Sequence, residues 1–246
     1  MYPELFKIGS LTIYSYGFFV ALGFLAATYA AGRRAKKYGV SPEKILDVNI
    51  YSFLAGIAGA RILYVLTEFK YYAANPVQIL KIWEGGLVFY GGLIGGVLFF
   101  FWYVKKQKMD ALLVADIIIP AVALGQVFGR IGCFMRGCCY GKESEKCGVI
   151  FKDIGDNLPH IPTQLIESAA VLAVFLFLIN RNPKFKGEIF SLYIVMYGII
   201  RFFIEFLRAD ERGPVFFNML SVSQLISLLA VIFAAILYGR LKTKKS

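Results

Sequence analysis

The sequence predicts an all-α integral membrane protein, a bundle of seven transmembrane helices with a lipid-accessible central cavity. Hydrophobic residues make up 58% of the 246-residue chain, and the mean hydropathy is +0.64. Apolar runs of about 20 residues recur, which is the length at which a helix crosses a bilayer, and the chain has room for about seven of them. The runs are continuous and lack the alternating polarity of transmembrane strands, so the spans are expected to be helical.

The chain is expected to form a single transmembrane domain over residues 1–246. An outer amphipathic segment over residues 67–83 should lie along the membrane interface. An outer loop over residues 134–162 contains most of the cysteines. The predicted spans cover residues 11–32, 45–66, 84 onwards, 112–133, 163–179, 188–207 and 221–239.

Positive charge follows the membrane topology. The net charge of +11 comes largely from lysine and arginine clusters after the first, third, fifth and last predicted spans. Clusters on alternate loops are the positive-inside pattern, which predicts an outer N-terminus and a cytoplasmic C-terminus. We expect these charges to be solvated and attracted to anionic headgroups rather than to bind nucleic acid. No cleavable signal peptide is expected, since the first apolar run follows a polar start and lacks a small-residue cleavage site.

The stretch over residues 128–141 is the most unusual part of the chain. It packs two arginines, four glycines and three cysteines into fourteen residues at the end of an apolar run. An arginine near bilayer depth is costly, so Arg130 is expected to face the protein interior or a water-filled cavity. The glycines, Gly129 among them, are expected to let the backbone turn and to free amide donors beside that guanidinium. Such a site would suit a phosphate.

A second polar group lies on the sixth predicted span. Tyr197, Arg201, Glu205 and Arg208 recur at four- and three-residue steps, which places them on one helical face. A polar stripe inside an apolar helix requires a cavity and partners. Arg201 and Glu205 can pair with each other, and donors would remain for an anionic ligand.

Other polar residues in the spans have two interpretations each. Arg61 either snorkels to the outer surface or faces a cavity. Tyr90, flanked by glycine pairs, is either an interfacial aromatic or a phenol that takes part in chemistry; the glycines themselves indicate a helix break or close helix packing. Tyr16 is either an aromatic anchor or a site residue. Thr163 and Glu167 are expected to serve an ordinary helix start, with the glutamate available for capping.

The cysteines and the single histidine do not indicate a metal site. Cys133, Cys138, Cys139 and Cys147 lack the spacing of paired C-x-x-C units, so no metal is expected. An outer, oxidising location would allow one or two disulfides, for example Cys138 or Cys139 with Cys147. A reactive thiol is the lesser alternative. His160, in a polar loop, is expected to be a bystander.

Five motifs, in order along nearly the whole chain, resemble those of the prolipoprotein diacylglyceryl transferase family. Any one of them would be weak, but five in register are specific. They are Tyr16-Gly17, the glycine-rich stretch from Gly85 to Gly95, Gly129-Arg130-Ile131-Gly132-x-Phe134, Pro162-Thr163-Gln164-Leu165-x-Glu167, and Tyr197-Gly198-x-x-Arg201-x-x-x-Glu205-Phe206-x-Arg208.

The resemblance implies a seven-span enzyme of the bacterial cytoplasmic membrane with a cavity open to the outer leaflet. Such enzymes move the diacylglyceryl group of phosphatidylglycerol to the lipobox cysteine thiol of a prolipoprotein and release glycerol phosphate, with no soluble cofactor. By this resemblance Arg130 holds the lipid phosphate, and Arg201 with Glu205 forms a second essential pair. The residues expected at the site are Arg130, Arg201 and Tyr90 as catalytic groups and Tyr16, Arg61, Gly129, Gln164, Tyr197, Glu205 and Arg208 as substrate-binding groups.

The chemistry of the residues agrees with this resemblance in two of three tasks. When a thiol attacks the glycerol carbon and expels a phosphate monoester, the site must bind a phosphodiester, stabilise the leaving group and help ionise the thiol. Arg130 and Arg201 suit the first two tasks as bidentate, always-charged donors. The family usually has a histidine where Tyr90 stands, and a phenol, with an ordinary pKa of about 10, is a poor base unless cations lower that value.

Three more positions depart from the family pattern. The family commonly has asparagines where Cys133 and Arg136 stand and an acidic residue where Cys138 stands. These departures leave three hypotheses open: lipoprotein diacylglyceryl transfer, a related lipid transferase with a different acceptor, and a non-enzymatic phospholipid-binding or transport protein.

Overall fold

The computed structural model describes residues 2–9, 11–151, 155–209, 215–216 and 220–244. The chain divides into two compact units, a larger unit of Met1–Ala31 with Ala115–Ser246 and a smaller unit of Gly32–Val114. Residues 152–154 of the predicted outer loop lie outside the described residues.

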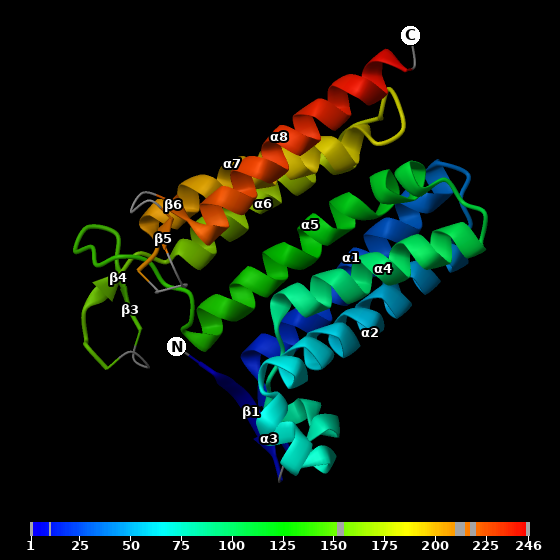
Figure 1. The fold of residues 1–246 in the computed structure, drawn as a ribbon. Helices are drawn as coiled ribbons and strands as arrows, with labels where there is room; N and C mark the ends of the chain where they lie inside the picture. The colour runs from blue at the N-terminus through cyan, green and yellow to red at the C-terminus, as the bar shows by residue number, and fades with distance from the viewer. Residues whose placement is uncertain (1, 10, 152–154, 210–214, 217–219, 245–246) are drawn as a thin grey trace. The chain divides into compact units, whose positions relative to one another are not determined.

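The protein is an all-helical, multi-pass membrane protein, as predicted. Eight α-helices are found among the described residues, and six of them are long and apolar enough to cross a membrane (Figure 1). Within the same described ranges, three small antiparallel two-stranded sheets lie outside these helices. The six helices are α1 (Ser15–Lys37), α2 (Pro42–Thr67), α5 (Ala111–Arg136), α6 (Thr163–Asn180), α7 (Glu188–Leu207) and α8 (Val222–Thr243).

The predicted bounds agree best with the observed helix limits in the later spans. The helix α7 has the predicted limits, and α6 ends one residue later than expected. The first span was predicted four residues too early, because β2 (Leu11–Tyr14) pairs with β1 (Glu4–Ile8) as an antiparallel hairpin. The alternation in Leu-Thr-Ile-Tyr and the left-handed backbone of Gly9 (φ 60°) favour that hairpin over a helical turn.

Close glycine packing dominates the smaller unit. The predicted third span forms α4 (Phe89–Lys106), which packs along α2 (Figure 1). A Cβ atom on Gly59 would collide with the backbone of Gly91, and one on Gly95 would collide with the carbonyl of Ala55. The two helices are therefore in direct backbone contact, which confirms the packing interpretation of these glycines. Gly85 precedes α4 and has a positive φ of 92°, so it belongs to a turn and not to the contact between the two helices.

The predicted outer amphipathic segment folds as three short helical pieces in the same unit. They are α3 (Phe69–Ala74), η1 (Pro76–Leu80) and η2 (Ile82–Glu84). Arg61 holds the later pieces, since its guanidinium donates to the carbonyls of residues 78, 79, 81, 85 and 86.

In the larger unit α7 packs against both α6 and α8 (Figure 1). Buried aliphatic side chains such as Val127, Val171 and Leu178 line the α5–α6–α7 contact. The start of α7 is fixed to α5, because the buried carboxylate of Asp116 accepts the amides of Gly187 at 2.7 Å and Phe190 at 2.9 Å. A carboxylate at a helix N-terminus satisfies unpaired amides and complements the helix dipole.

The other two sheets are short pairs in the loops of the same unit. Strands β3 (Val149–Ile150) and β4 (Pro159–His160) pair within the cysteine-containing loop. Strands β5 (Val215–Phe216) and β6 (Leu220–Ser221) pair just before α8.

Candidate functional site

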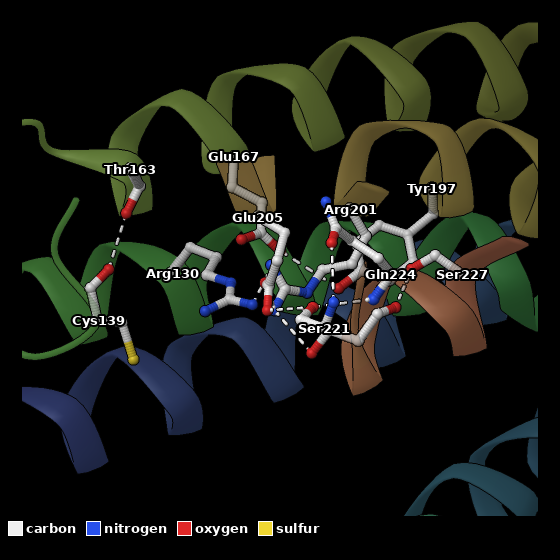
Figure 2. A network of polar contacts seen from close by, with 11 residues as sticks. Arg130, Cys139, Thr163, Glu167, Tyr197, Arg201, Glu205, Ser221, Gln224 and Ser227 are labelled. Atoms are coloured by element: carbon white, nitrogen blue, oxygen red, sulfur yellow. Dashed lines mark hydrogen bonds and ion pairs between the residues drawn. The ribbon is translucent and has the colours of Figure 1, made fainter. Parts of the chain in front are cut away.

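The site is centred on a buried ion pair between α5 and α6. Arg130 Nη2 lies 2.8 Å from Glu167 Oε1, and the side chains are 17% and 1% exposed. The hydroxyl of Tyr197 on α7 donates to the same carboxylate oxygen at 3.2 Å. Three helices therefore meet at one carboxylate, as Figure 2 shows. The prediction that Arg130 faces the protein interior is confirmed.

A second ion pair lies on α7, where the polar stripe was predicted. Arg201 Nη2 is 2.5 Å from Glu205 Oε2, and both side chains are buried. Ser221 donates to the other oxygen of Glu205 at 2.9 Å, and Ser223 accepts from Arg201 at 3.3 Å. Ser221 also forms the capping box of α8 with Gln224, so the start of α8 and the end of α7 share this contact.

The two ion pairs form one polar network around Tyr197. Electrostatic contacts join the Tyr197 hydroxyl to Glu167, Arg130 and Arg201. Figure 2 shows the two arginines, from α5 and α7, directed into the same group of side chains. The two guanidinium and two carboxylate charges balance one another inside this network.

Three buried polar atoms of the network have no hydrogen-bond partner among the described residues. They are Arg201 Nη1, Glu167 Oε2 and Glu205 Oε2, of which only Glu205 Oε2 lies in an ion pair, with Arg201 Nη2. An unpaired buried donor on a guanidinium costs free energy, on the order of 1–3 kcal/mol or more for a charged group. An anionic oxygen bound at Arg201 Nη1 would remove that cost. The arrangement thus suits a ligand with a phosphate group.

The glycine motif is helical, and the prediction of a turn with free amides beside Arg130 is wrong. The helix α5 continues to Arg136, and the first left-handed residue after it is Gly137 (φ 81°). A glycine inside a membrane helix is tolerated where a neighbouring helix packs closely, and this applies to Gly132. A Cβ atom on Gly132 would lie 3.2 Å from Phe19 and 3.4 Å from Tyr16 on α1. The absence of a side chain at Gly132 therefore allows α1 to pack closely against α5. Beside Gly129 a Cβ atom would meet nothing within 4 Å.

Residues at the start of α6 hold the loop that follows α5. Gln164 Nε2 donates to the carbonyl of Cys138 at 2.6 Å, and Thr163 Oγ1 donates to that of Cys139 at 2.8 Å. Gln164 is fully buried, and its Oε1 has no hydrogen-bond partner among the described residues. Arg208, the buried C-cap of α7, contacts the Cys139 thiol.

Glu167 is the site residue that the sequence prediction missed. It was assigned an ordinary capping role, but α6 is capped by Pro162 without a side-chain hydrogen bond. The signal was present, since a carboxylate one turn inside an apolar helix requires a cationic partner. Only the fold identifies that partner as Arg130.

The cysteines form a cluster that their spacing did not predict. The sulfur atoms of Cys133, Cys138 and Cys139 all lie within 4.8 Å of one another. All four cysteines carry thiols, so the disulfides that an oxidising location would allow are absent, and Cys147 is exposed. Hydrogen bonds from the Cys133 and Cys138 thiols and the nearby Arg208 guanidinium lower the pKa of the Cys139 thiol, although burial opposes this.

His160 anchors the cysteine-containing loop rather than joining the site. Its Nδ1 contacts the carbonyl of Gly141 at 3.0 Å, and its Nε2 lies 2.8 Å from the carboxylate of Asp156. Burial opposes the charged imidazole, but these contacts outweigh it and raise the pKa of His160. The pKa of Asp156 is lowered by the amide of Leu158 and by His160.

The smaller unit contains the remaining two predicted site residues, Arg61 and Tyr90. All five N–H donors of Arg61 are used by backbone carbonyls, and its guanidinium lies 5.2 Å from the ring centre of Tyr72. An apolar cavity of about 550 Å³ and a polar one of about 360 Å³ both border Arg61. Its observed contacts are therefore those of a structural anchor. Tyr90 is half-exposed at the start of α4.

Comparison with known proteins places these residues in a family context. The family model described as prolipoprotein diacylglyceryl transferase matches residues 3–240 of the chain. A phosphatidylglycerol–prolipoprotein diacylglyceryl transferase of Clostridium tetani is 41% identical over 245 residues, which cover 97% of each protein. The corresponding transferase 2 of Clostridium perfringens is 41% identical, covering 97% of this chain and 94% of the relative. The Staphylococcus aureus (strain Newman) protein is 34% identical, covering 98% of this chain and 90% of the relative.

Proposed function

The chain belongs to the prolipoprotein diacylglyceryl transferase family, and from this membership we propose that it transfers diacylglyceryl from phosphatidylglycerol to a prolipoprotein thiol. It is a membrane transferase of lipoprotein biogenesis. The acceptor is the lipobox cysteine, and the leaving product is glycerol phosphate. The observation that carries the proposal is the buried network of Arg130 and Arg201, which matches the family motifs and leaves Arg201 Nη1 without a partner.

The network supports a shared role for the two arginines. Each guanidinium is held by a carboxylate, Arg130 by Glu167 and Arg201 by Glu205, which fixes its orientation before a lipid arrives. A guanidinium pre-oriented in this way stabilises charge on a phosphate without reorganising during the reaction. In the proposed reaction the thiol sulfur forms a bond to the glycerol carbon. The carbon–oxygen bond to phosphate breaks with its electron pair on the leaving oxygen, and the arginines offset the developing charge.

The thiol proton needs an acceptor, for which Tyr90 remains our proposal. Tyr90 follows the glycine turn at the start of α4 and has a half-exposed ring. Tyr16 and Gly129 are proposed to border the lipid, because α1 packs on α5 at Gly132 and space lies beside Gly129. We propose that Gln164 and Arg208 act through the loop they hold rather than by direct phosphate contact.

We further propose seven spans, with α4 as the seventh, and a cavity open to the outer leaflet. The direct glycine contact of α4 with α2 supports this, since such contacts are typical of paired membrane helices. In the larger unit the β1 hairpin and the end of α8 lie at opposite ends of the helices (Figure 1). An odd number of spans accounts for that separation. Lysines and arginines at the C-terminal ends of α1, α4 and α8 support a cytoplasmic location of those ends.

The deciding experiment supplies purified protein with labelled phosphatidylglycerol and a lipobox peptide. We expect a thioether-linked diacylglyceryl peptide together with stoichiometric glycerol phosphate. A peptide with serine in place of the lipobox cysteine is the control and should accept nothing. Lipid turnover without lipidated peptide would indicate another acceptor, whereas lipid binding without glycerol phosphate release would indicate a binding or transport protein.

A further inference from the structure

The three clustered thiols lie one helical turn from the proposed phosphate site. Cys133 is three residues after Arg130 on α5, and Cys138 and Cys139 follow in the loop. Their sulfur atoms lie within 4.8 Å of one another. Cys133 and Cys139 are close enough to Arg130 to interact with its charge. The cluster therefore belongs to the same part of the larger unit as the ion-pair network.

The loop backbone is held in an unusual conformation that brings these thiols together. Cys139 has a left-handed backbone (φ 69°), which is unfavourable for a non-glycine residue. The amide of Cys138 donates to the carbonyl of Cys133 at 3.2 Å, which folds the loop back onto α5. Gln164 and Thr163 clamp the next two carbonyls. Two α6 side chains thus fix the thiols in a conformation that the loop alone would disfavour.

The spacing of the sulfur atoms fits three thiolates around one cation. Thiolates that bind Zn²⁺ tetrahedrally at about 2.3 Å lie about 3.8 Å apart, so the cluster needs to contract by about 1 Å at most. Soft thiolate ligands select d¹⁰ cations such as Zn²⁺ and Cd²⁺ over hard cations. Three thiolates and a divalent cation leave one negative charge, which the neighbouring Arg208 can offset.

We propose that Cys133, Cys138 and Cys139 form a binding site for a single thiophilic divalent cation, with three thiolate ligands and one open coordination position. The hydrogen bonds from Gln164 and Thr163 to the loop are the outer contacts that orient these ligands. Cys147, exposed and outside the cluster, does not take part.

The open position has a specific occupant, an inference that rests on the proposed function. The acceptor in that reaction is itself a thiol, which must lose its proton before it attacks. A thiol that coordinates a cation is deprotonated outright. The fourth position would therefore hold the acceptor sulfur as a thiolate near Arg130, and the proton released on coordination would pass to Tyr90, the acceptor proposed above.

The test of the site uses Cd²⁺ as the probe and the whole protein in detergent under reductant-free argon. Titration should give one thiolate-to-Cd²⁺ absorption band that saturates at one equivalent. In Cys133→Ser, Cys138→Ser and Cys139→Ser, binding should weaken by about 100-fold or more, since even outer-shell changes cost about 10–100-fold. Cys147→Ser is the matched control and should bind as the unaltered chain does. Equal binding by all four variants would overturn the proposal.

A second measurement needs no variant and so does not depend on variant folding. Bound Cd²⁺ should protect the three clustered thiols of the unaltered chain from iodoacetamide and leave Cys147 reactive, as read by mass spectrometry of the peptides. Equal labelling of all four cysteines with Cd²⁺ present would contradict the site. A disulfide within the cluster of the freshly isolated protein would do the same.

The open position is tested separately with Co²⁺. Adding a lipobox peptide should intensify the sulfur-to-Co²⁺ absorption as a fourth thiolate binds, and the serine peptide should not. No change with the thiol peptide would remove the acceptor role while leaving the three-thiolate site in place. Absence of diacylglyceryl transfer both with and without bound metal would instead count against the proposed function.

Discussion

Glu167 on α6 and Arg130 on α5 form an ion pair at 2.8 Å, with the carboxylate almost completely buried. A carboxylate inside an apolar bundle is stable only with its cationic partner. This pairing means that the arginine proposed to bind the lipid phosphate is held by a residue that need not touch the lipid. Glu167 also accepts the Tyr197 hydroxyl, so it links α5, α6 and α7.

We predict that Glu167→Gln lowers both stability and transfer activity. The amide keeps the shape but leaves a buried guanidinium without a counter-charge, and breaking such a pair costs about 3–5 kcal/mol. Thermal unfolding in detergent and the peptide lipidation rate measure the two effects. Glu145→Gln, in the exposed part of the loop, is the control and should change neither. A fully active, equally stable Glu167→Gln protein would show that Arg130 is positioned by other contacts.

Arg130→Lys should lose most of its activity while keeping the fold. A point ammonium can still pair with Glu167, but it cannot reproduce the planar fork that binds a phosphate in a bidentate manner. The transfer rate should fall about 100-fold, which corresponds to about 2.7 kcal/mol of transition-state stabilisation. Arg240→Lys, exposed near the end of α8, controls for the substitution itself. Near-normal turnover in Arg130→Lys would argue against a phosphate clamp at this position.

If Tyr90 accepts the thiol proton, Tyr90→Phe should abolish turnover with phosphatidylglycerol binding retained. The substitution removes only the hydroxyl, and the half-exposed ring remains. Binding and turnover are measured separately, by lipid retention on the purified protein and by glycerol phosphate release. Retained turnover would assign the proton to another group, for which the cysteine cluster is the first alternative to test.

His160 should titrate above the ordinary histidine pKa of about 6.5. It is the only histidine in the chain, so its imidazole carbon gives one NMR signal to follow. Because the folded-state pKa is raised, its stabilising contribution is complete below about pH 6.5 and is lost as pH rises through the folded-state value. The pKa of Asp156 is lowered in the folded state, so the pH dependence of its contribution to stability is opposite. That contribution is lost as pH falls through the folded-state pKa of Asp156.

The Asp156→Asn substitution tests how much Asp156 contributes to the raised pKa of His160. It removes the carboxylate that lies 2.8 Å from His160 Nε2, so the pKa of His160 should fall toward its ordinary value. A His160 pKa that is unchanged in Asp156→Asn would show that the Gly141 carbonyl alone sets it.

Gly91→Ala should destabilise the smaller unit. Its Cβ atom would collide with the carbonyl of Gly59, and forcing extra volume into such a contact costs about 1–3 kcal/mol. Gly239→Ala is the matched control, since a Cβ atom there meets nothing within 4 Å and alanine favours a helix by about 1 kcal/mol. Thermal unfolding of the two variants should therefore shift in opposite directions. A shift upward in both would mean that α2 and α4 can separate without loss.

Much of the helical architecture was predictable from the sequence, because the length of each apolar run matches the length of a helix that crosses a bilayer. The limits of α7 follow from its terminal polar residues, and the face shared by Tyr197, Arg201 and Glu205 follows from helical periodicity alone. The hairpin before α1 was not predictable, since the pairing of Leu11–Tyr14 depends on a partner strand as well as on composition.

Contacts between distant residues were the part that the sequence could not supply. Arg61 was predicted either to snorkel to the surface or to face a cavity, and it was placed among the substrate-binding residues. The acceptors of its guanidinium are carbonyls about 20 residues later in the chain, which the sequence could not identify. The three thiols were dismissed as a metal site on spacing. Their convergence depends on the left-handed backbone of Cys139 and on clamps from α6, neither of which the spacing encodes.

The carboxylate of Asp116 has a consequence for the proposed site, which lies far from its own position. It holds Gly187, which precedes Arg201 by 14 residues, or about 21 Å along a helix. Each residue of axial slippage turns an α-helix by about 100°, so a shift of one residue would turn the arginine out of the polar network around Tyr197. Asp116 therefore fixes the axial position and rotation of α7, and so the direction of the Arg201 side chain is set by a contact at the start of that helix.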